Sequence, residues 1–517
     1  MDRATLPNDP QADFVRKVLI VGGGSAGWMA AAMLSRVLGP ATEIELVESE
    51  DVGIVGVGEA TIPPLRKFNQ FCGVDESAFL RDTQGTFKVG IEFENWGKIG
   101  DRYLHAFGRV GQELDAVVRM HHWWNLGRIA GGENYPEWQD LFLGRSAMDL
   151  QRFGFGANEQ DVSALLPHAY HFDAVAYGQH LRRLSESRGV KRTEGKIVSV
   201  SKDGESGNVQ DVTLDDGRRI SAELFIDCTG FRSLLLGDAM EEEFDDWSHW
   251  LPSDRAVVVQ SESDSNEILP ATRSIAQPVG WQWRIPLQNR IGNGHVYSSS
   301  FCDDAEAESQ LLANIEGNAL SEPRILRFKT GRRQRPWVGN VVGLGLSAGF
   351  LEPLESTSIH LVHAGLERLV ELFPTRNMPP LLRNRFNEQS EREWNQVRDF
   401  IIAHYKVTQR DDSEFWRYTR EMQVPDSLSE ILSLWKENGT LAVDGGHLFQ
   451  LGSWAAILIG QNLLPNNVHP LAVRVDPSQI VPRIQQLSQA LRKRAETLPN
   501  HAAFVSRMGA AGKSAAD

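Results

Sequence analysis

A turn of three spaced glycines near the start of the chain limits its fold more than any other feature of the sequence. The apolar run from Arg16 leads into Gly22-x-Gly24-x-x-Gly27, an alanine-rich stretch continues to about Leu38, and a second strand pattern at residues 43–47 ends on Glu48. This order is typical of a Rossmann unit, in which glycines admit a pyrophosphate, the helix N-terminus attracts its charge and the acid binds a ribose hydroxyl. We therefore expect a dinucleotide, FAD or NAD, at Gly22, Gly24, Ser25, Ala26, Gly27 and Glu48.

Charge and cysteine usage exclude several classes of function. The chain has 517 residues and a net charge of -15 at pH 7, whereas nonspecific nucleic-acid binding needs clustered Lys and Arg. Cys72, Cys228 and Cys302 stand far apart, so we expect neither a metal site nor disulfides. No apolar run reaches the roughly 18 residues of a membrane span, and the N-terminus lacks the order of a signal peptide. The sequence predicts a cytoplasmic enzyme with no nucleic-acid or membrane partner.

A second anion site is predicted where GLGLSAGFLEPLESTSIH begins at Gly343. A strand at residues 338–344 is followed by a glycine-containing turn and a helix, for which Ser356, Thr357 and Ser358 supply an N-cap. The NH groups that begin such a helix favour an anion or a polarised cofactor oxygen. From spacing alone, an ordinary crossover with a solvated Glu355 is the commoner explanation. The apolar face of the helix is predicted to carry Ile359, Val362, Leu366, Leu369 and Phe373.

Coarser patterns organise the rest of the chain. Residues 86–96 alternate as one strand, which would place Lys88, Gly90 and Glu92 together on a solvent face. The stretch at 53–64, rich in glycine and proline, is predicted to be a loop, and so is the stretch at 101–108. We further expect a helix at 173–188, a hairpin at 196–200 with 209–214, a strand at 222–226, an antiparallel sheet within 257–301 and helices from 381 to 494.

Six motifs recur in the order found in the flavin-dependent halogenases, the tryptophan-halogenase-like family, and the chain resembles that family over most of its length. They are GGGSAGW, GVGEAT, GTFKVGIEFENWG, DCTGFRSLL, WQWRIP and GLGLSAGFLEPLEST. The resemblance implies an α/β (α+β) fold, with a Rossmann-type FAD-binding domain of the flavin monooxygenase kind interleaved with an antiparallel substrate sheet. The expected divisions are residues 1–380 for this unit, 381–505 for a mainly helical cap and 506–517 for a disordered tail.

The resemblance also implies roles for individual residues. Lys88 would receive hypohalous acid and present the halogen as a haloamine or through a hydrogen bond, and Glu355 would orient Lys88 or take the ring proton. Thr357 and Ser358 would hold halide, and His105, Phe107 and Trp454 would contact the aromatic substrate. Trp281, Trp283, Ile285 and Pro286 would separate that substrate from the flavin. Further FAD contacts would come from Gly58, Glu59, Ala60, Ile197, Leu346 and Ile359.

The implied reaction uses reduced FAD supplied by a separate flavin reductase, oxygen and chloride or bromide to halogenate an electron-rich aromatic such as indole. A helix N-terminus contributes about 0.3–2 kcal/mol to anion binding, whereas millimolar affinity needs about 4 kcal/mol, so halide should bind weakly. Residues 445–475 contain no carboxylate to pair with an ammonium group. Indole or an indole derivative is therefore expected rather than free tryptophan.

Two other functions are compatible with a flavin fold. A flavin-dependent aromatic hydroxylase would oxidise NAD(P)H directly and add oxygen without halide, and a catalytically silent flavin-binding sensor would do neither. The joint presence of Lys88 and Glu355 favours the halogenase. The sequence leaves the oligomeric state open, with a homodimer among the options.

Overall fold

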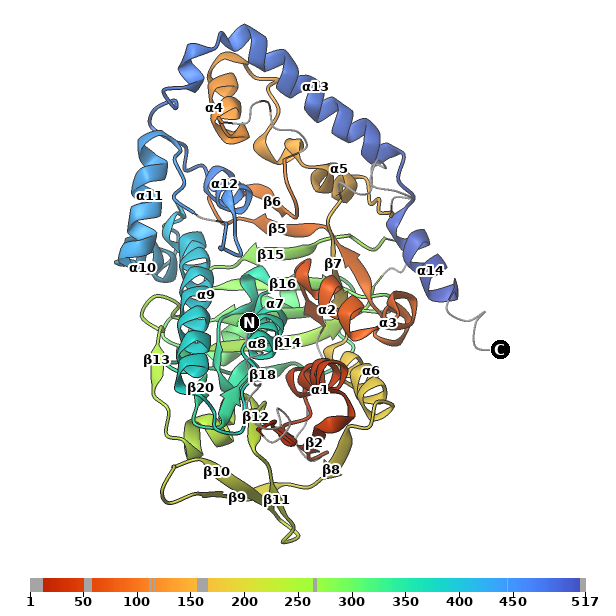
Figure 1. Cartoon of the computed structure of the whole chain (residues 1–517). Helices are drawn as coiled ribbons and strands as arrows, with labels where there is room; N and C mark the ends of the chain where they lie inside the picture. The colour runs from red at the N-terminus through yellow and green to blue at the C-terminus, as the bar shows by residue number, and fades with distance from the viewer. Residues whose placement is uncertain are drawn as a thin grey trace, which may run out of the picture.

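The computed structural model describes residues 13–50, 58–110, 114, 117–155, 166–263, 267–443 and 445–511. A six-stranded, mainly parallel sheet lies in the lower half of Figure 1. Its apolar central strand is buried, as is typical of parallel sheets with both faces covered. The strand order is β20 (Trp337–Val338), β21 (Val341–Gly343), β12 (Leu224–Asp227), β1 (Lys17–Val21), β2 (Glu43–Glu48) and β8 (Lys191–Glu194).

Helix α1 (Ser25–Leu38) packs against α6 (Ala174–Glu186) and α8 (Ser358–Glu371), which confirms the predicted Rossmann arrangement. One part of the prediction is wrong. The single strand expected at 338–344 is a tight antiparallel pair, β20 and β21, because the chain reverses at Gly339 with φ +56°. Only β21 pairs with β12.

A seven-stranded sheet forms the second layer and carries the predicted antiparallel sheet, with one parallel pair between β5 and β15. Residues 101–108, predicted to be a loop, instead contribute its edge strand, because their backbone pairs with β5. The order is β18 (Arg324–Arg327), β14 (Arg255–Ser261), β17 (Ile291–Tyr297), β16 (Trp281–Pro286), β15 (Thr272–Ala276), β5 (Gly90–Glu94) and β6 (Arg102–Ala106).

The strand predicted at 86–96 is divided at Val89 into β4 (Thr86–Lys88) and β5, which belong to different sheets. Strand β4 lies beside β7 (Ala169–Phe172), and β7 also pairs with β3 (Glu59–Ala60). Glu59 and Ala60 are therefore in a strand rather than the predicted loop, and residues 53–57 lie outside the described part of the chain. The change of sheet at Val89 also places Lys88 and Glu92 in different environments, contrary to the prediction.

Two smaller sheets and several short helices complete this part of the chain. The hairpin predicted at 196–214 is confirmed. The sheets comprise β9 (Ile197–Lys202), β10 (Val209–Leu214) and β11 (Arg219–Ser221), and β13 (Phe244–Asp246), β19 (Gly331–Arg333) and β22 (Gly349–Phe350). The helices are α2 (Pro64–Cys72), α3 (Glu76–Asp82), α4 (Met120–Ala130), α5 (Leu143–Asp149) and α7 (Asp304–Asn314).

Helices dominate the chain after residue 380, as predicted. Helix α13 arches over α4 and α5 at the top of Figure 1, so earlier segments share this layer with the C-terminal helices. Helix α14 includes residues 506–511, which corrects the disordered tail predicted from 506. No helix within the described ranges is long and apolar enough to cross a membrane. The C-terminal helices are α9 (Pro380–Lys406), α10 (Glu414–Glu421), α11 (Asp426–Asn438), α12 (Leu451–Gly460), α13 (Pro477–Glu496) and α14 (His501–Ala511).

Candidate active site

The glycine turn after β1 has the shape that a dinucleotide requires. Gly22 has φ +106°, and a Cβ there would lie 2.3 Å from the Cys228 carbonyl oxygen. A Cβ at Gly27 would lie 1.9 Å from the carbonyl oxygen of Gly22, whereas the space around Gly24 is open. No side chain caps the first turn of α1. An open glycine beside an uncapped helix start fits the pyrophosphate of FAD.

The other predicted FAD contacts come from several elements of the fold. The Glu48 carboxylate lies over Gly23 and is held by the Arg192 guanidinium, with 2.5 Å between Nε and Oε1. Gly58 approaches Ile285, since a Cβ at this glycine would be 3.4 Å from the isoleucine Cγ2. A Cβ at Gly345 would be 3.0 Å from the Cβ of Ala26, so the turn after β21 lies close to the start of α1. Ile197 lies in a small apolar core beneath the sheet, Leu346 is half exposed and Ile359 is buried.

Lys88 is completely buried, which corrects the solvent-facing position predicted from strand periodicity. Its Nζ donates a hydrogen bond to Ser356 Oγ at 2.8 Å and lies 5.4 Å from the centre of the Phe107 ring. Burial lowers the pKa of Lys88 to about 7, because desolvation disfavours the ammonium form more than Glu355 and Glu59 stabilise it. A substantial fraction of this lysine is therefore a neutral, nucleophilic amine near neutral pH.

Glu355 is also completely buried and lies between two histidines. His105 Nδ1 is 2.9 Å from Oε2, and His404 Nε2 is 2.9 Å from Oε1. Burial acts to raise the pKa of Glu355, but His105 and His404 together outweigh it and hold this pKa at about 2. The carboxylate is therefore ionised at neutral pH.

The tautomer of His404 follows from its second contact. Its Nδ1 lies 2.8 Å from the carbonyl oxygen of Phe400, and a carbonyl oxygen can only accept a hydrogen bond, so Nδ1 carries a proton. Its Nε2 lies 2.9 Å from Glu355 Oε1 but makes no hydrogen bond to any described residue, so this contact does not fix a second proton on the ring. The predicted carboxylate is present, and the sequence analysis did not identify His404 as its second histidine neighbour.

His404 and Ser356 are the functional candidates that the sequence analysis missed. His404 is one histidine within a 27-residue helix and belongs to no motif, so no local signal marks it. Ser356 was predicted to help cap α8, but it has a left-handed backbone with φ +57° and accepts the Lys88 hydrogen bond. The N-cap position is Thr357, whose side chain makes no capping bond, so the predicted side-chain cap is wrong. Among described residues, Thr357 Oγ1 has no hydrogen-bond partner, and Ser358 begins the helix.

The predicted wall lies on one strand, but its four residues do not share one face. Trp281, Trp283 and Ile285 alternate along β16 on the inner face and are buried, with 6.0 Å between the two indole centres. Pro286 points to the opposite face, because side chains alternate along a strand. There it lines a pocket of about 760 Å³ together with Arg284.

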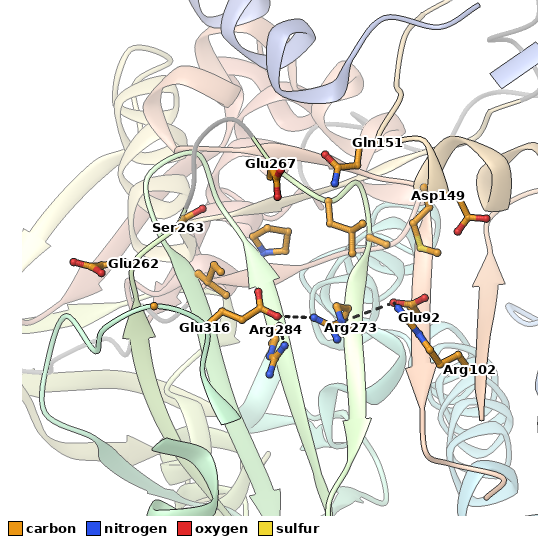
Figure 2. Close-up of a pocket in the computed structure, with 16 residues that line it drawn as sticks. Glu92, Arg102, Asp149, Gln151, Glu262, Ser263, Glu267, Arg273, Arg284 and Glu316 are labelled. Atoms are coloured by element: carbon orange, nitrogen blue, oxygen red, sulfur yellow. Dashed lines mark hydrogen bonds and ion pairs between the residues drawn. The ribbon is translucent and has the colours of Figure 1, made fainter. Parts of the chain in front are cut away.

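Figure 2 shows the charged side chains that line this outer pocket, and neither Lys88 nor Glu355 is among its lining residues. Arg273, Arg284 and Glu92 come from adjacent strands and line one wall. The arginines already have partners: Arg273 contacts Glu316 at 2.8 Å, and Arg284 also bonds to Glu316. We therefore assign this pocket no role in the predicted halogenation.

The predicted substrate contacts His105 and Trp454 belong to an aromatic cluster beside Glu355. Phe400 and Phe449 stack with 3.8 Å between ring centres, and the Trp454 ring meets Phe400 edge-on at 5.0 Å. The His105 ring is 5.7 Å from Phe400 and 6.1 Å from Phe449. The tertiary structure thus adds Phe400 and Phe449 to the predicted substrate contacts. Phe107, the third predicted contact, lies beside Lys88.

A glycine turn shaped for a dinucleotide and a buried lysine and carboxylate occur together in one α/β fold, which suits a flavin-dependent enzyme. The sequence model of the tryptophan halogenase family matches residues 17–477. The chain belongs to this family and is a flavin-dependent halogenase, an enzyme that uses FAD and halide.

Similar proteins cover nearly the whole chain. Tryptophan 7-halogenase RebH of Lentzea aerocolonigenes is 33% identical over 95% of this chain and 98% of its own. The structure of Xcc4156, a flavin-dependent halogenase from Xanthomonas campestris, matches with a TM-score of 0.92 and 42% identity over 96% of this chain and 98% of its own. BrvH, a flavin-dependent halogenase from Brevundimonas sp. BAL3, matches with a TM-score of 0.90 and 39% identity over 96% and 99%.

Proposed function

We propose that this halogenase relays hypohalous acid through Lys88 to an electron-rich aromatic substrate such as indole. The observation that carries the proposal is the burial of Lys88 within the electrostatic influence of the ionised carboxylate of Glu355. When bound, FAD reduced by a separate reductase would supply, with oxygen, the oxidising equivalents that convert halide to hypohalous acid. Gly22, Gly24, Ser25, Ala26, Gly27 and Glu48 would hold its dinucleotide part.

Lys88 would act as the nucleophile. Its neutral amine attacks the halogen of hypohalous acid, a nitrogen–halogen bond forms, the oxygen–halogen bond breaks, and the departing hydroxide takes an amine proton as water. Ser356 holds Nζ in place by accepting its hydrogen bond. The distance of 2.8 Å between Nζ and Ser356 Oγ suits a charged or a neutral lysine, so the pH dependence of the rate separates a haloamine from a purely hydrogen-bonding lysine.

The aromatic ring then takes the halogen from Lys88. A pair of ring electrons forms the carbon–halogen bond, the nitrogen–halogen bond breaks, and Glu355 accepts the ring proton, which can return to the lysine nitrogen. His105 and His404 keep Glu355 ionised and fixed in place before the reaction. Helices α9 and α12 provide Phe400, His404 and Trp454, so the proposed role of the helical layer is to cover the substrate.

A bromination assay tests this function. Purified protein is incubated with FAD, a flavin reductase, NADH, bromide and indole, and the product is analysed by mass spectrometry. We expect the isotope doublet of one bromine atom, whereas a product heavier by one oxygen would identify a hydroxylase, and an unchanged substrate would favour a flavin-binding sensor. Omitting the reductase supplies the control: NADH alone should leave the flavin oxidised, and rapid bleaching would contradict a two-component enzyme.

Indole should be halogenated faster than free tryptophan under matched conditions. The reason is the absence of an acidic side chain from residues 445–475, since a buried ammonium group without a partner is costly to desolvate. The measurement is a competition between equal concentrations of the two substrates, with kcat/KM taken from the product ratio. A clear preference for tryptophan would mean that an acid from another segment binds the ammonium group.

A further inference from the structure

A second buried carboxylate, Glu352, lies three residues before Glu355 and has no role in the chemistry above. Its side chain is completely buried. Neither of its oxygens has a direct hydrogen-bond partner among the described residues. Its polar neighbours are the hydroxyls of Ser253 and Tyr405 and the indole NH of Trp281. Like the two oxygens of Glu352, none of these three groups has a direct hydrogen-bond partner in the described part of the chain.

The three neighbours come from separate parts of the fold. Ser253 precedes β14, Trp281 begins β16 and Tyr405 lies in the last turn of α9. Buried polar groups are nearly always hydrogen-bonded, so four of them gathered at one point form a single network, closed directly or through one water molecule. An indole NH can only donate, and Glu352 is the member best able to accept its hydrogen bond.

The surroundings of Glu352 determine its charge. The groups that face it are neutral side chains, and no described Lys, Arg or His is among them. Burial raises the pKa of Glu352 to about 7, although Tyr405, Trp281 and Ser253 act in the opposite direction. Glu355 differs because it lies between two histidines. At pH 6, one short segment therefore holds one ionised carboxylate and one carboxylic acid that is mostly protonated.

We propose that Glu352 is a positioning residue that accepts the hydrogen bond of the Trp281 indole and so fixes the wall between the flavin and the substrate. Trp281 also contacts Trp283, with 6.0 Å between ring centres, and Trp96, with 6.5 Å. Movement of Trp281 would thus loosen the aromatic packing on the inner face of β16. This role rests on the proposed relay, because a loosened wall lets hypohalous acid escape before it reaches Lys88.

Two variants separate anchoring from packing. Glu352→Gln keeps the shape and both hydrogen-bonding functions of a neutral acid, whereas Glu352→Ala removes them. Free hypobromous acid is trapped with monochlorodimedone during turnover with indole, and the escape ratio is the trapped halogen divided by the brominated indole. At pH 6 we expect a severalfold higher ratio for Glu352→Ala and a wild-type ratio for Glu352→Gln. A raised ratio for Glu352→Gln at pH 6 would overturn the anchoring role.

The pH dependence supplies a readout that packing alone would not change. The wild-type escape ratio should fall severalfold between pH 6 and pH 8.5 relative to the ratio of Glu352→Gln, because ionised Glu352 accepts the hydrogen bond of the Trp281 indole more strongly than the neutral acid. Lys88 titrates in the same range but is present in both proteins, so the difference between them isolates Glu352. Parallel pH profiles would show that Glu352 does not control the wall, and this comparison remains decisive if Glu352→Ala fails to fold.

A measurement without turnover distinguishes this inference from the proposed function. Because Glu352 keeps its proton in the folded protein up to about pH 7 and loses it near pH 4.5 when unfolded, its contribution to stability falls as pH rises between these values. The thermal midpoint of the wild type should therefore drop relative to Glu352→Gln from pH 5 to pH 7.5. A constant difference would refute the neutral acid. A changing difference without any halogenated product would instead refute the proposed function.

Discussion

Replacing Lys88 by Ala should leave oxidation of reduced flavin by oxygen near the wild-type rate while aromatic halogenation falls by about a hundredfold or more. The two effects separate because Lys88 is proposed to act only after hypohalous acid has formed. Its Nζ contacts Ser356, whereas the neighbouring Phe87 ring stacks on Phe153 with 4.2 Å between centres. Loss of the lysine therefore leaves that aromatic packing in place. Flavin oxidation is followed by absorbance and halogenation by chromatography.

Two further substitutions control for changes in shape and charge. Lys88→Met keeps most of the side-chain volume and should be as inactive in halogenation as Lys88→Ala. Lys202 is an exposed lysine whose Nζ donates to the Ala239 carbonyl at 2.7 Å, and Lys202→Met should retain wild-type halogenation. If Lys88→Ala halogenates indole with wild-type rate and regioselectivity, freely diffusing hypohalous acid is the reagent and the role assigned to Lys88 is wrong.

Glu355→Gln should lower halogenation by about a hundredfold, because it removes the proton acceptor while keeping the shape of the side chain. It should also change the pH profile. The negative charge of Glu355 raises the pKa of Lys88 against the larger effect of burial, so its loss lowers that pKa below about 7. The neutral amine then exists at lower pH, and the acidic limb of the halogenation rate should shift to lower pH. Rates between pH 5.5 and 9 give this limb.

Glu393 offers a matched control for this substitution. Its Oε1 lies 3.0 Å from His360 Nε2, so it is also a carboxylate paired with a histidine, but it is not in contact with Lys88 or Glu355. Glu393→Gln should leave both the rate and the acidic limb near wild type. Retention of FAD binding by Glu355→Gln, measured by fluorescence titration, shows that the cofactor site is intact. An unshifted acidic limb in Glu355→Gln would mean that Lys88 does not titrate under the influence of this carboxylate.

Local sequence determined the dinucleotide turn and helix α8, which follows the second predicted anion site. The steric requirement at Gly27 comes from the Gly22 carbonyl oxygen within one strand–turn–helix unit, so glycine spacing predicts it, whereas the requirement at Gly22 comes from the distant Cys228 carbonyl oxygen. The apolar spacing that begins at Ile359 likewise predicted α8, which is confirmed at Ser358–Glu371. Both features repeat over a few residues, and such short-range patterns are the part of a fold that a single sequence expresses most directly.

Patterns of the same kind failed where a distant strand or side chain decided the outcome. Alternation from residue 86 to 96 predicted one strand, but β4 pairs with β7 and β5 pairs with β6 and β15. The hydroxyl-rich segment after Glu355 predicted a side-chain cap, yet Ser356 bonds to Lys88 instead. A residue pattern indicates which contacts a segment could make. The strands and side chains that decide between those contacts come from elsewhere in the fold.

The sequence by itself determined the fold class, the family and the identity of the predicted catalytic pair. Only the tertiary structure decided the environment that sets the charge of these side chains. It buried Lys88 and placed Glu355 between His105 and His404. It also left a second carboxyl group, Glu352, among neutral groups. Those histidines lie 250 residues before Glu355 and 49 residues after it. The charge of an acid or an amine depends on desolvation and on the charges within a few ångströms, and the chain acquires both only when it folds.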